Sequence, residues 1–281
     1  MAKRDACEDW RRFDAANIPS KSSTPQLDRF LRAVQETAST NTPFTLLDVG
    51  CGNGRVGRRL YDRGFSVLGV DVNPDAIRAA RELAVTADAP DRFLRFVEGD
   101  FAADCLPLVE GGPFDVVVCQ LVLSIIGDAR QRTNLLRHVR ENIRPGSWLY
   151  LSASGVSDAI NAGYARLYAE DIHWTGERHS YLSRNEQKEV LYMTHHFTVD
   201  ELVHELEAAG FDQINVTTEK EVSSRRPDEA AYFHYATCVA HDRTVSIEER
   251  QTRASINVSA ATLRQDSDRA RNTAGRFSPG K

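Results

Sequence analysis

The segment 46–54, LLDVGCGNG, combines a carboxylate with glycines at alternate positions. Alternate glycines leave no side chains over a turn, so a ligand can approach the backbone closely and meet the N–H groups at the start of the next helix. An apolar run precedes the segment from Phe44, and Val56, Leu60 and Tyr61 follow it at helical spacing. The sequence therefore predicts a strand, a ligand-binding turn and a helix in direct succession.

This turn fits two kinds of nucleotide ligand. Residues 52–57 form a GxGxxG pattern and Asp71 follows about 20 residues later, as in NAD-binding proteins. Asp48, however, would place a carboxylate where a dinucleotide carries its pyrophosphate, and the two anions would repel each other. A carboxylate suits a ligand with a positive centre, such as an ammonium or a sulfonium. The sequence favours a ligand of that kind, and an NAD-dependent oxidoreductase is the alternative.

Two further acids stand at the ends of the next two expected strands. Asp71 can accept hydrogen bonds from ribose hydroxyls, and Asp100 can accept one from an exocyclic amine such as that of adenine. Phe101 can add an apolar contact and a backbone N–H. The carboxyl ends of parallel strands share one edge of a sheet, so Asp48, Asp71 and Asp100 are expected to line one crevice. Each acid alone could instead cap the following helix.

Apolar runs of strand length alternate with helical patterns over most of the chain. Strands are expected at 44–49, 66–70, 93–97, 114–119 and 148–153, and helices at 54–63, 74–87 and 129–142. This order predicts an α/β fold with right-handed crossovers and a doubly wound, parallel sheet. After a helix at 198–209, residues 211–218 and 231–240 are expected to form a final hairpin.

The remaining segments suggest the domain organisation. Residues 1–43 are expected to form an N-terminal arm and a helix from Pro25, ahead of a ligand-binding domain at 44–240. Within that domain, an insertion at about 155–197 is rich in Tyr, His and Trp and shows no clear strand. It follows the fifth strand at the carboxyl edge, so it is expected to cover the site. The tail 241–281 has few large apolar residues and is expected to be disordered.

The composition limits the kinds of partner that we expect for this protein. The net charge of −5 gives no reason to expect nucleic acid or an anionic membrane as a partner. There is no apolar signal region near the N-terminus and no run of the roughly 18 apolar residues that a membrane helix needs. The five scattered cysteines lack any CxxC pair, which fits a reducing cytoplasm and argues against a structural zinc site. We therefore expect a cytoplasmic protein without a membrane or metal partner.

Taken in order, these motifs resemble those of the class I S-adenosylmethionine-dependent methyltransferases, a Rossmann-like family, here of the small-molecule type. The similar stretches are LLDVGCGNG at 46–54, VLGVDVNP at 67–74, FVEGDF at 96–101, FDVVVCQLVLSII at 114–126 and IRPGSWLYLS at 143–152. The resemblance spans about 44–240. It implies a seven-stranded, mostly parallel sheet whose last strand is antiparallel, with a helical or loop cap over the carboxyl edge, and S-adenosyl-L-methionine as the cofactor.

The resemblance also implies roles for individual residues. Asp48 and the glycine turn would hold the methionyl end of the cofactor, Asp71 the ribose, and Asp100 with Phe101 the adenine. Gln120 and Leu121 would lie under the sulfonium methyl. The full set of expected cofactor residues is Asp48, Gly50, Cys51, Gly52, Asn53, Gly54, Asp71, Val72, Asp100, Phe101, Gln120 and Leu121.

A sulfonium methyl group is already activated, so the protein has mainly to align the acceptor and exclude water. A base is needed only when the acceptor must lose a proton. Within the cap, His195 and His173 are the candidates for that base. The alternative for the pair His195–His196 is that one ring packs and the other is solvated.

The expected function is methyl transfer to a hydroxyl, carboxyl or amine of a small organic molecule. An RNA-modifying methyltransferase is an alternative that the Arg-containing tail keeps open, against the net charge and the lack of a recognisable RNA-binding module. A protein of this fold that only binds partners is a further alternative.

Overall fold

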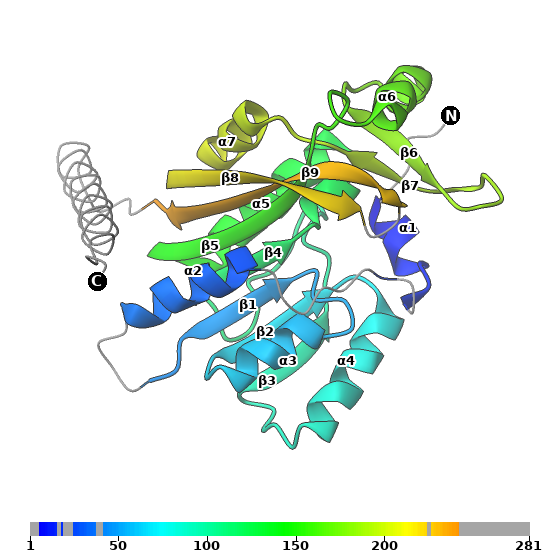
Figure 1. Cartoon of the computed structure of the whole chain (residues 1–281). Coiled ribbons are helices and arrows are strands. Elements are labelled where there is room, and N and C mark those ends of the chain that lie inside the picture. Colours follow the sequence, from blue (N-terminus) through cyan, green and yellow to red (C-terminus); the bar gives the residue numbers. More distant parts are fainter. Residues whose placement is uncertain (1–5, 16–17, 19–24, 38–41, 224–225, 242–281) are drawn as a thin grey trace, which may run out of the picture. The chain divides into compact units, whose positions relative to one another are not determined.

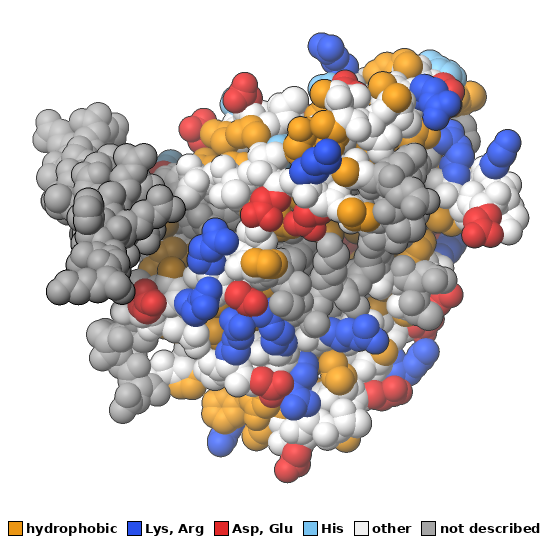
Figure 2. All heavy atoms as spheres, in the orientation of Figure 1, with side chains coloured by type: hydrophobic (Ala, Val, Ile, Leu, Met, Phe, Trp, Pro, Cys, Tyr) orange, Lys and Arg blue, Asp and Glu red, His pale blue; other side chains and the backbone are white. Residues whose placement is uncertain are grey.

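The computed structural model describes residues 6–15, 18, 25–37, 42–223 and 226–241 (Figure 1). The tail expected to be disordered lies, from residue 242 onward, outside the described residues. Among the residues that are described, no helix is long and apolar enough to cross a membrane. Basic and acidic side chains are interspersed over the face of the molecule drawn in Figure 2.

A seven-stranded sheet forms the centre of the fold. Its strands are β1 (Thr45–Val49), β2 (Ser66–Asp71), β3 (Leu94–Glu98), β4 (Phe114–Gln120), β5 (Ile143–Gly155), β8 (Phe211–Ser223) and β9 (Arg226–Ala240). They lie in the order β3-β2-β1-β4-β5-β9-β8 (Figure 1). The first five are parallel, and β9 runs antiparallel to both of its neighbours. The expected doubly wound sheet with an antiparallel last strand is confirmed.

Helices cover both faces of the sheet. They are α2 (Pro25–Glu36), α3 (Arg55–Asp62) and α4 (Pro74–Thr86) on one face, and α5 (Ala129–Glu141) and α7 (Val199–Ala208) on the other. Side-chain caps fix where several of them begin. Asn73 accepts a hydrogen bond from the N–H of Ala76 at the start of α4, and Thr198 with Glu201 forms a capping box at the start of α7.

Two sequence-based expectations about strands were wrong. The final hairpin is longer than expected, because β8 continues to Ser223 and β9 begins at Arg226. The cap also contains strands: it consists of α6 (Ala162–Thr175) and a separate two-stranded sheet of β6 (Ser180–Arg184) and β7 (Val190–His195). These two strands are short and mix polar with aromatic residues, because the small sheet packs against only one helix and does not need two apolar faces. Such a sheet leaves no apolar run for a pattern to detect.

The ring of Phe96 in β3 fills the space beneath the glycine turn. It is 1% exposed. A Cβ added at Gly69 in β2 would lie 2.5 Å from its Cδ1 atom, and one added at Gly54 would lie 2.8 Å from its Cζ atom. The absence of side chains at these glycines is therefore what lets the turn pack onto the sheet.

We predict that Gly69→Ala lowers the free energy of unfolding by about 1–3 kcal/mol, because the added methyl group overlaps the Phe96 ring. Urea unfolding of both proteins measures the loss. The same substitution should cost less in a Phe96→Leu background, where the ring is gone. Relief should be partial, since the Cβ of Cys51 also lies 2.9 Å from the added atom. An equal cost in both backgrounds would contradict the assignment to Phe96.

Candidate cofactor and acceptor site

A cavity of about 310 Å³ lies at the carboxyl edge of the sheet. Most of its lining comes from three parts of the chain: the ends of the parallel strands, the N-terminal arm with α1 (Ala6–Arg11), and the cap. Leu135 of α5 and two residues of β9, Ala231 and Phe233, complete it. From the strand ends come Gly50, Asp71, Val72, Asp100, Phe101, Gln120 and Leu121, all of them expected as cofactor residues. The structure thus brings seven of the expected residues together on one wall.

The glycine turn has the backbone that its sequence predicts. Gly50, Gly52 and Gly54 all have positive φ, at 70°, 51° and 77°. At Gly50, which lines the cavity, an added Cβ would lie 2.2 Å from the Val122 side chain. The other expected turn residues, Cys51, Gly52, Asn53 and Gly54, do not line the cavity. Ile18 of the arm lies over Gly52, 3.3 Å from an added Cβ.

Asp48 lies behind this wall rather than on it. Its carboxyl group is buried, and its Oδ2 atom has no hydrogen-bond partner among the described residues. Burial, and to a smaller extent the neighbouring Asp71, raises the pKa of Asp48 to about 7. A buried acceptor without a partner, next to a second carboxylate, fits a ligand that brings a cation or N–H donors.

Asp71 connects the turn to the next strand. Its Oδ2 atom accepts the N–H of Gly52 at 2.8 Å, and its Oδ1 atom accepts the N–H of Asn73 at 2.9 Å. Burial raises the pKa of Asp71, and these backbone donors oppose the shift. The carboxylate is therefore held in one orientation on the cavity wall.

At the strand end expected to bind adenine, a carboxylate again accepts a backbone N–H. Asp100 accepts the N–H of Ala102 at 2.9 Å, and Phe101 is buried against the cavity. His138 of α5 donates from Nδ1 to the carbonyl oxygen of Phe101 at 2.8 Å, which fixes that backbone from behind. The sequence pattern did not point to His138.

Gln120 ends β4, and Leu121 follows it with a φ of 60°. A non-glycine residue in this left-handed region is strained and is often found at functional sites. The N–H of Leu121 donates to the carbonyl oxygen of Ser152 at 2.9 Å, which holds the turn against β5. The strand end is thereby bent into the cavity.

The N-terminal arm closes one side of the cavity. The side-chain amide of Asn73 donates to the carbonyl oxygens of Trp10 at 2.9 Å and Phe13 at 2.8 Å. The indole N–H of Trp10 donates to the carbonyl oxygen of Ile125 at 3.3 Å, and its ring lies 4.5 Å from that of Tyr192 in β7. Asn73 follows Asp71 closely, so the arm is anchored beside the expected ribose site.

Neither candidate base from the sequence lies on the cavity. His173 is exposed on α6, with its ring 4.8 Å from that of Trp174. His195 is buried but bonds elsewhere, with Nδ1 2.8 Å from the Ser180 hydroxyl and Nε2 3.0 Å from Glu201. The expectation that one ring of the pair is solvated was also wrong, because His195 and His196 are both buried.

The histidine that lines the cavity is His196. Alternate residues of a strand face the same side, and Tyr192, Thr194 and His196 all line the cavity whereas His195 points to the other side of β7. This alternation was the sequence signal that could have found His196, had the strand been recognised.

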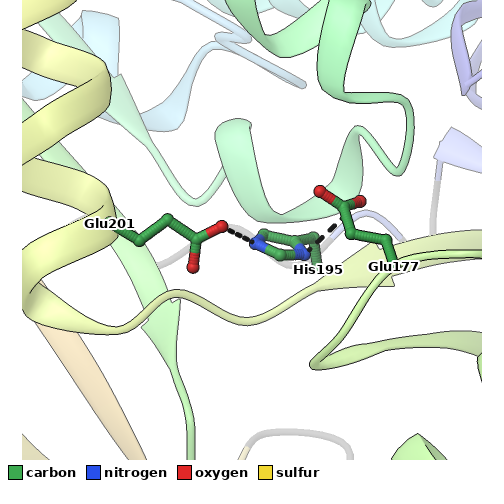
Figure 3. Close-up of side chains that lie close together, drawn as sticks. All are labelled: Glu177, His195 and Glu201. Atoms are coloured by element: carbon green, nitrogen blue, oxygen red, sulfur yellow. Dashed lines mark hydrogen bonds and ion pairs between the residues drawn. The ribbon is translucent and has the colours of Figure 1, made fainter.

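His195 belongs to an ion-pair network with Glu177 and Glu201 (Figure 3). The buried Arg132 of α5 is part of it: its guanidinium bonds Glu177 and lies 3.7 Å from Glu205 of α7. Arg132 also donates to the carbonyl oxygen of Gly127 at 3.0 Å. The three residues of Figure 3 could hold a metal ion by distance. Arg132, however, already supplies positive charge to Glu177, so we interpret the cluster as a tie between the cap and the core.

We predict that Arg132→Met lowers the free energy of unfolding by about 3–5 kcal/mol, because it leaves partly buried carboxylates without their cation. Denaturant unfolding measures the loss. Arg130→Met on the same helix is the matched control, since the Arg130 side chain is exposed in a surface pair with Asp104. That variant should lose no more than about 1 kcal/mol. Equal losses in the two variants would rule out the network as a major contribution.

We also predict that the ligand-free protein loses stability as the pH rises from about 4 to 7. The pKa of Asp48 is raised from 3.8 to about 7, so in this range the folded state keeps a proton that the unfolded state has lost. The loss attributable to Asp48 is at most roughly 4 kcal/mol. Asp48→Asn removes the titration, and urea unfolding at several pH values should give a flatter profile for this variant. Parallel profiles would show that Asp48 is not the source.

Comparison with known proteins places this site in a family. A family model described as a methyltransferase domain matches residues 23–216. The N-demethylindolmycin N-methyltransferase of Streptomyces griseus is 25% identical over 221 residues, which cover 75% of this chain and 87% of the relative. A ubiquinone biosynthesis O-methyltransferase of Albidiferax ferrireducens is 31% identical over 107 residues, only 38% of this chain and 40% of the relative.

Among solved structures, a SAM-dependent methyltransferase from Methanosarcina mazei superposes with a TM-score of 0.63 at 24% identity, covering 78% of this chain and 99% of that one. This likeness confirms the fold. The family model spans well over half of the chain, and it favours the sulfonium ligand over NAD. The chain therefore belongs to the methyltransferase-domain family and is an S-adenosylmethionine-dependent methyltransferase.

Proposed function

We propose that the enzyme methylates a hydroxyl, carboxyl or amine group of a small organic molecule bound between the strand ends and the cap. The observation that carries this proposal is that one cavity is lined both by the expected cofactor residues and by aromatic side chains of the cap. The names of the two relatives describe an N- and an O-methyltransferase, which supports a nitrogen or oxygen atom as the methyl acceptor.

In this proposal the strand-end residues divide the cofactor among them. Asp48 and the glycine turn take the methionyl end: Gly50 lines the cavity, and the carboxyl group of Asp48 behind it favours an ammonium group. Asp71 accepts from the ribose hydroxyls, and Asp100 with Phe101 binds the adenine. Gln120 and Leu121 lie beneath the sulfonium. S-Adenosylmethionine supplies the activated methyl group, and the chain supplies orientation and a dry site.

The acceptor lies against the cap. Tyr164 of α6, Tyr181 of β6 and Tyr192 of β7 line the cavity, and Trp10 of the arm lies beside them. Aromatic walls with a few polar groups are typical of sites for small organic ligands. The arm and the cap together exclude water from the line along which the methyl group moves.

A small acceptor is favoured over RNA. The cofactor residues and the aromatic side chains of the cap share one cavity of about 310 Å³, which is not an open basic groove. The Arg-containing segment that left the RNA alternative open lies outside the described residues.

We predict that Asp71→Ala raises the Kd for S-adenosylhomocysteine by roughly 10- to 100-fold, because a charged acceptor for two hydroxyls is lost. Isothermal titration calorimetry measures the change. Asp75→Asn is the control, since Asp75 lies nearby on α4 with a side chain that is 61% exposed. Unchanged affinity in Asp71→Ala would contradict the proposed ribose contact.

The proposed activity is tested by incubating the protein with methyl-labelled S-adenosylmethionine and either a metabolite extract or bulk tRNA. We expect label in a small molecule, identified by mass spectrometry, and none in the RNA. Label in the tRNA alone would replace this proposal with the RNA-modifying alternative.

A further inference from the structure

We propose that Arg184 is a specificity-determining residue that binds a carboxylate on the acceptor, so that the substrate is a small organic acid methylated at another atom. This inference rests on the proposed function and narrows it to one class of acceptor. Three features of the cap support it: an irregular strand pairing at Arg184, a buried partner that orients its guanidinium, and two donors that the guanidinium keeps for a ligand.

Arg184 ends β6 beside the cavity. Its side chain is 31% exposed, and it lines the cavity together with the preceding residue, Ser183. Neighbouring residues of a regular strand face opposite sides. The pairing of β6 with β7 is irregular at this point, because Ser183 pairs with Tyr192 whereas Arg184 pairs with Val190. Irregularities of this kind redirect side chains and are common beside binding sites, which explains how two consecutive residues line one cavity.

A buried carboxylate holds the guanidinium in one orientation. Asp171 of α6 is 3% exposed and accepts hydrogen bonds from Nη2 of Arg184 at 2.6 Å and from Nη1 at 2.8 Å. Burial alone would raise the pKa of Asp171, but the hydrogen bonds from Arg184 and from the N–H of Leu182 lower it below its usual value. Asp171 is not among the residues that line the cavity, whereas Arg184 is. The ion pair therefore fixes Arg184 without withdrawing it from the cavity.

The guanidinium keeps two donors for a ligand. Of its five N–H groups, both on Nη1 donate, one to Asp171 and one to the carbonyl oxygen of Leu182 at 2.8 Å, and one on Nη2 donates to Asp171. The second N–H of Nη2 and the Nε–H have no hydrogen-bond partner among the described residues. These two lie next to each other on one side of the planar group. Two parallel N–H donors match the two oxygens of a carboxylate.

The direction of these donors, and not the net charge around them, makes the site selective. Asp171 already balances the charge of Arg184, and Glu170 adds a negative charge nearby. The sulfonium of the cofactor brings a positive charge to the same cavity, which favours an anionic acceptor there. A carboxamide fits the two donors less well than a carboxylate, because its own N–H group would meet one of them.

The carboxylate serves recognition, and the methyl group goes elsewhere on the acceptor. Two charge-assisted hydrogen bonds stabilise the negative charge on the carboxylate oxygens, which makes them weaker nucleophiles. The aromatic side chains of Tyr164 and Tyr181 line the same cavity and suit an apolar body attached to the carboxylate. The methylated atom is therefore a hydroxyl oxygen or an amine nitrogen of a small organic acid.

The class of acceptor is tested with the full-length protein, methyl-labelled S-adenosylmethionine and a metabolite extract. The labelled product is treated with a carbodiimide and methylamine, which convert a free carboxylate into an amide of known added mass. We expect this mass shift in the labelled product. A labelled product without a free carboxylate, such as a methyl ester, would overturn the inference and leave the proposed function standing. Failure to label any small molecule would overturn the proposed function itself.

The role of Arg184 is tested with the acceptor recovered from that extract. Arg184→Gln should lower kcat/KM by about 10- to 100-fold, mainly through KM, because two charge-assisted hydrogen bonds are lost. Arg184→Lys should recover only part of this loss, since an ammonium lacks the planar pair of donors. Arg178→Gln is the matched control, because Arg178 is exposed in the cap and does not line the cavity. Full activity in Arg184→Gln, or full recovery in Arg184→Lys, would contradict the assignment.

A comparison of the acceptor with its carboxamide separates binding from a purely structural role. An Arg184 that only ties β6 to α6 would, when replaced, lower activity equally on both compounds. We expect the wild-type enzyme to prefer the acid by at least about tenfold in kcat/KM, and Arg184→Gln to lose this preference. An unchanged preference in the variant would overturn the inference.

Discussion

The organisation of this enzyme depends on two carboxyl groups that are buried at the carboxyl edge of its sheet. Asp48 and Asp71 lie close enough that Asp71 raises the pKa of Asp48, and Asp48 keeps a buried oxygen without a partner among the described residues. Such a site is costly without a ligand, because burial disfavours the charged form of both groups. The glycine turn lies over the Phe96 ring and connects these two strand ends.

The acceptor end follows a different principle, in which separate elements are tied together by polar contacts. Arg132 links α5, the cap and the loop at Gly127, and His195 joins the cap to α7 through Glu201. The side chain of Asn73 anchors the N-terminal arm beside Asp71. These ties position the ring of His196 and the aromatic walls without lining the cavity themselves. The buried charges of the network thus hold the cap and the core together.

Much of the fold could be predicted from the chain. The fully buried Val116–Val118 run, the Asn73 cap and the Thr198 capping box are local signals, and each marks the element found in the structure. The cap could not be predicted equally well. Its strands β6 and β7 form a two-stranded sheet with a mixed polar and aromatic sequence, and Tyr181 of β6 packs against Tyr164 and Tyr168 of α6, a contact that the sequence of the hairpin does not reveal.

By itself, the sequence determined which strand ends meet at one edge of the sheet, because a turn with alternate glycines and acids at successive strand ends are local features that this edge must bring together. Only the tertiary structure decided the acceptor end. His195 ends β7 and His196 follows it, but only His196 lines the cavity, so the sequence could not tell the two apart until β7 was placed. His196 is also hydrogen-bonded to Tyr168, a residue of α6, at 2.7 Å. Such a choice rests on burial and hydrogen bonding across the fold, which residue order alone does not contain.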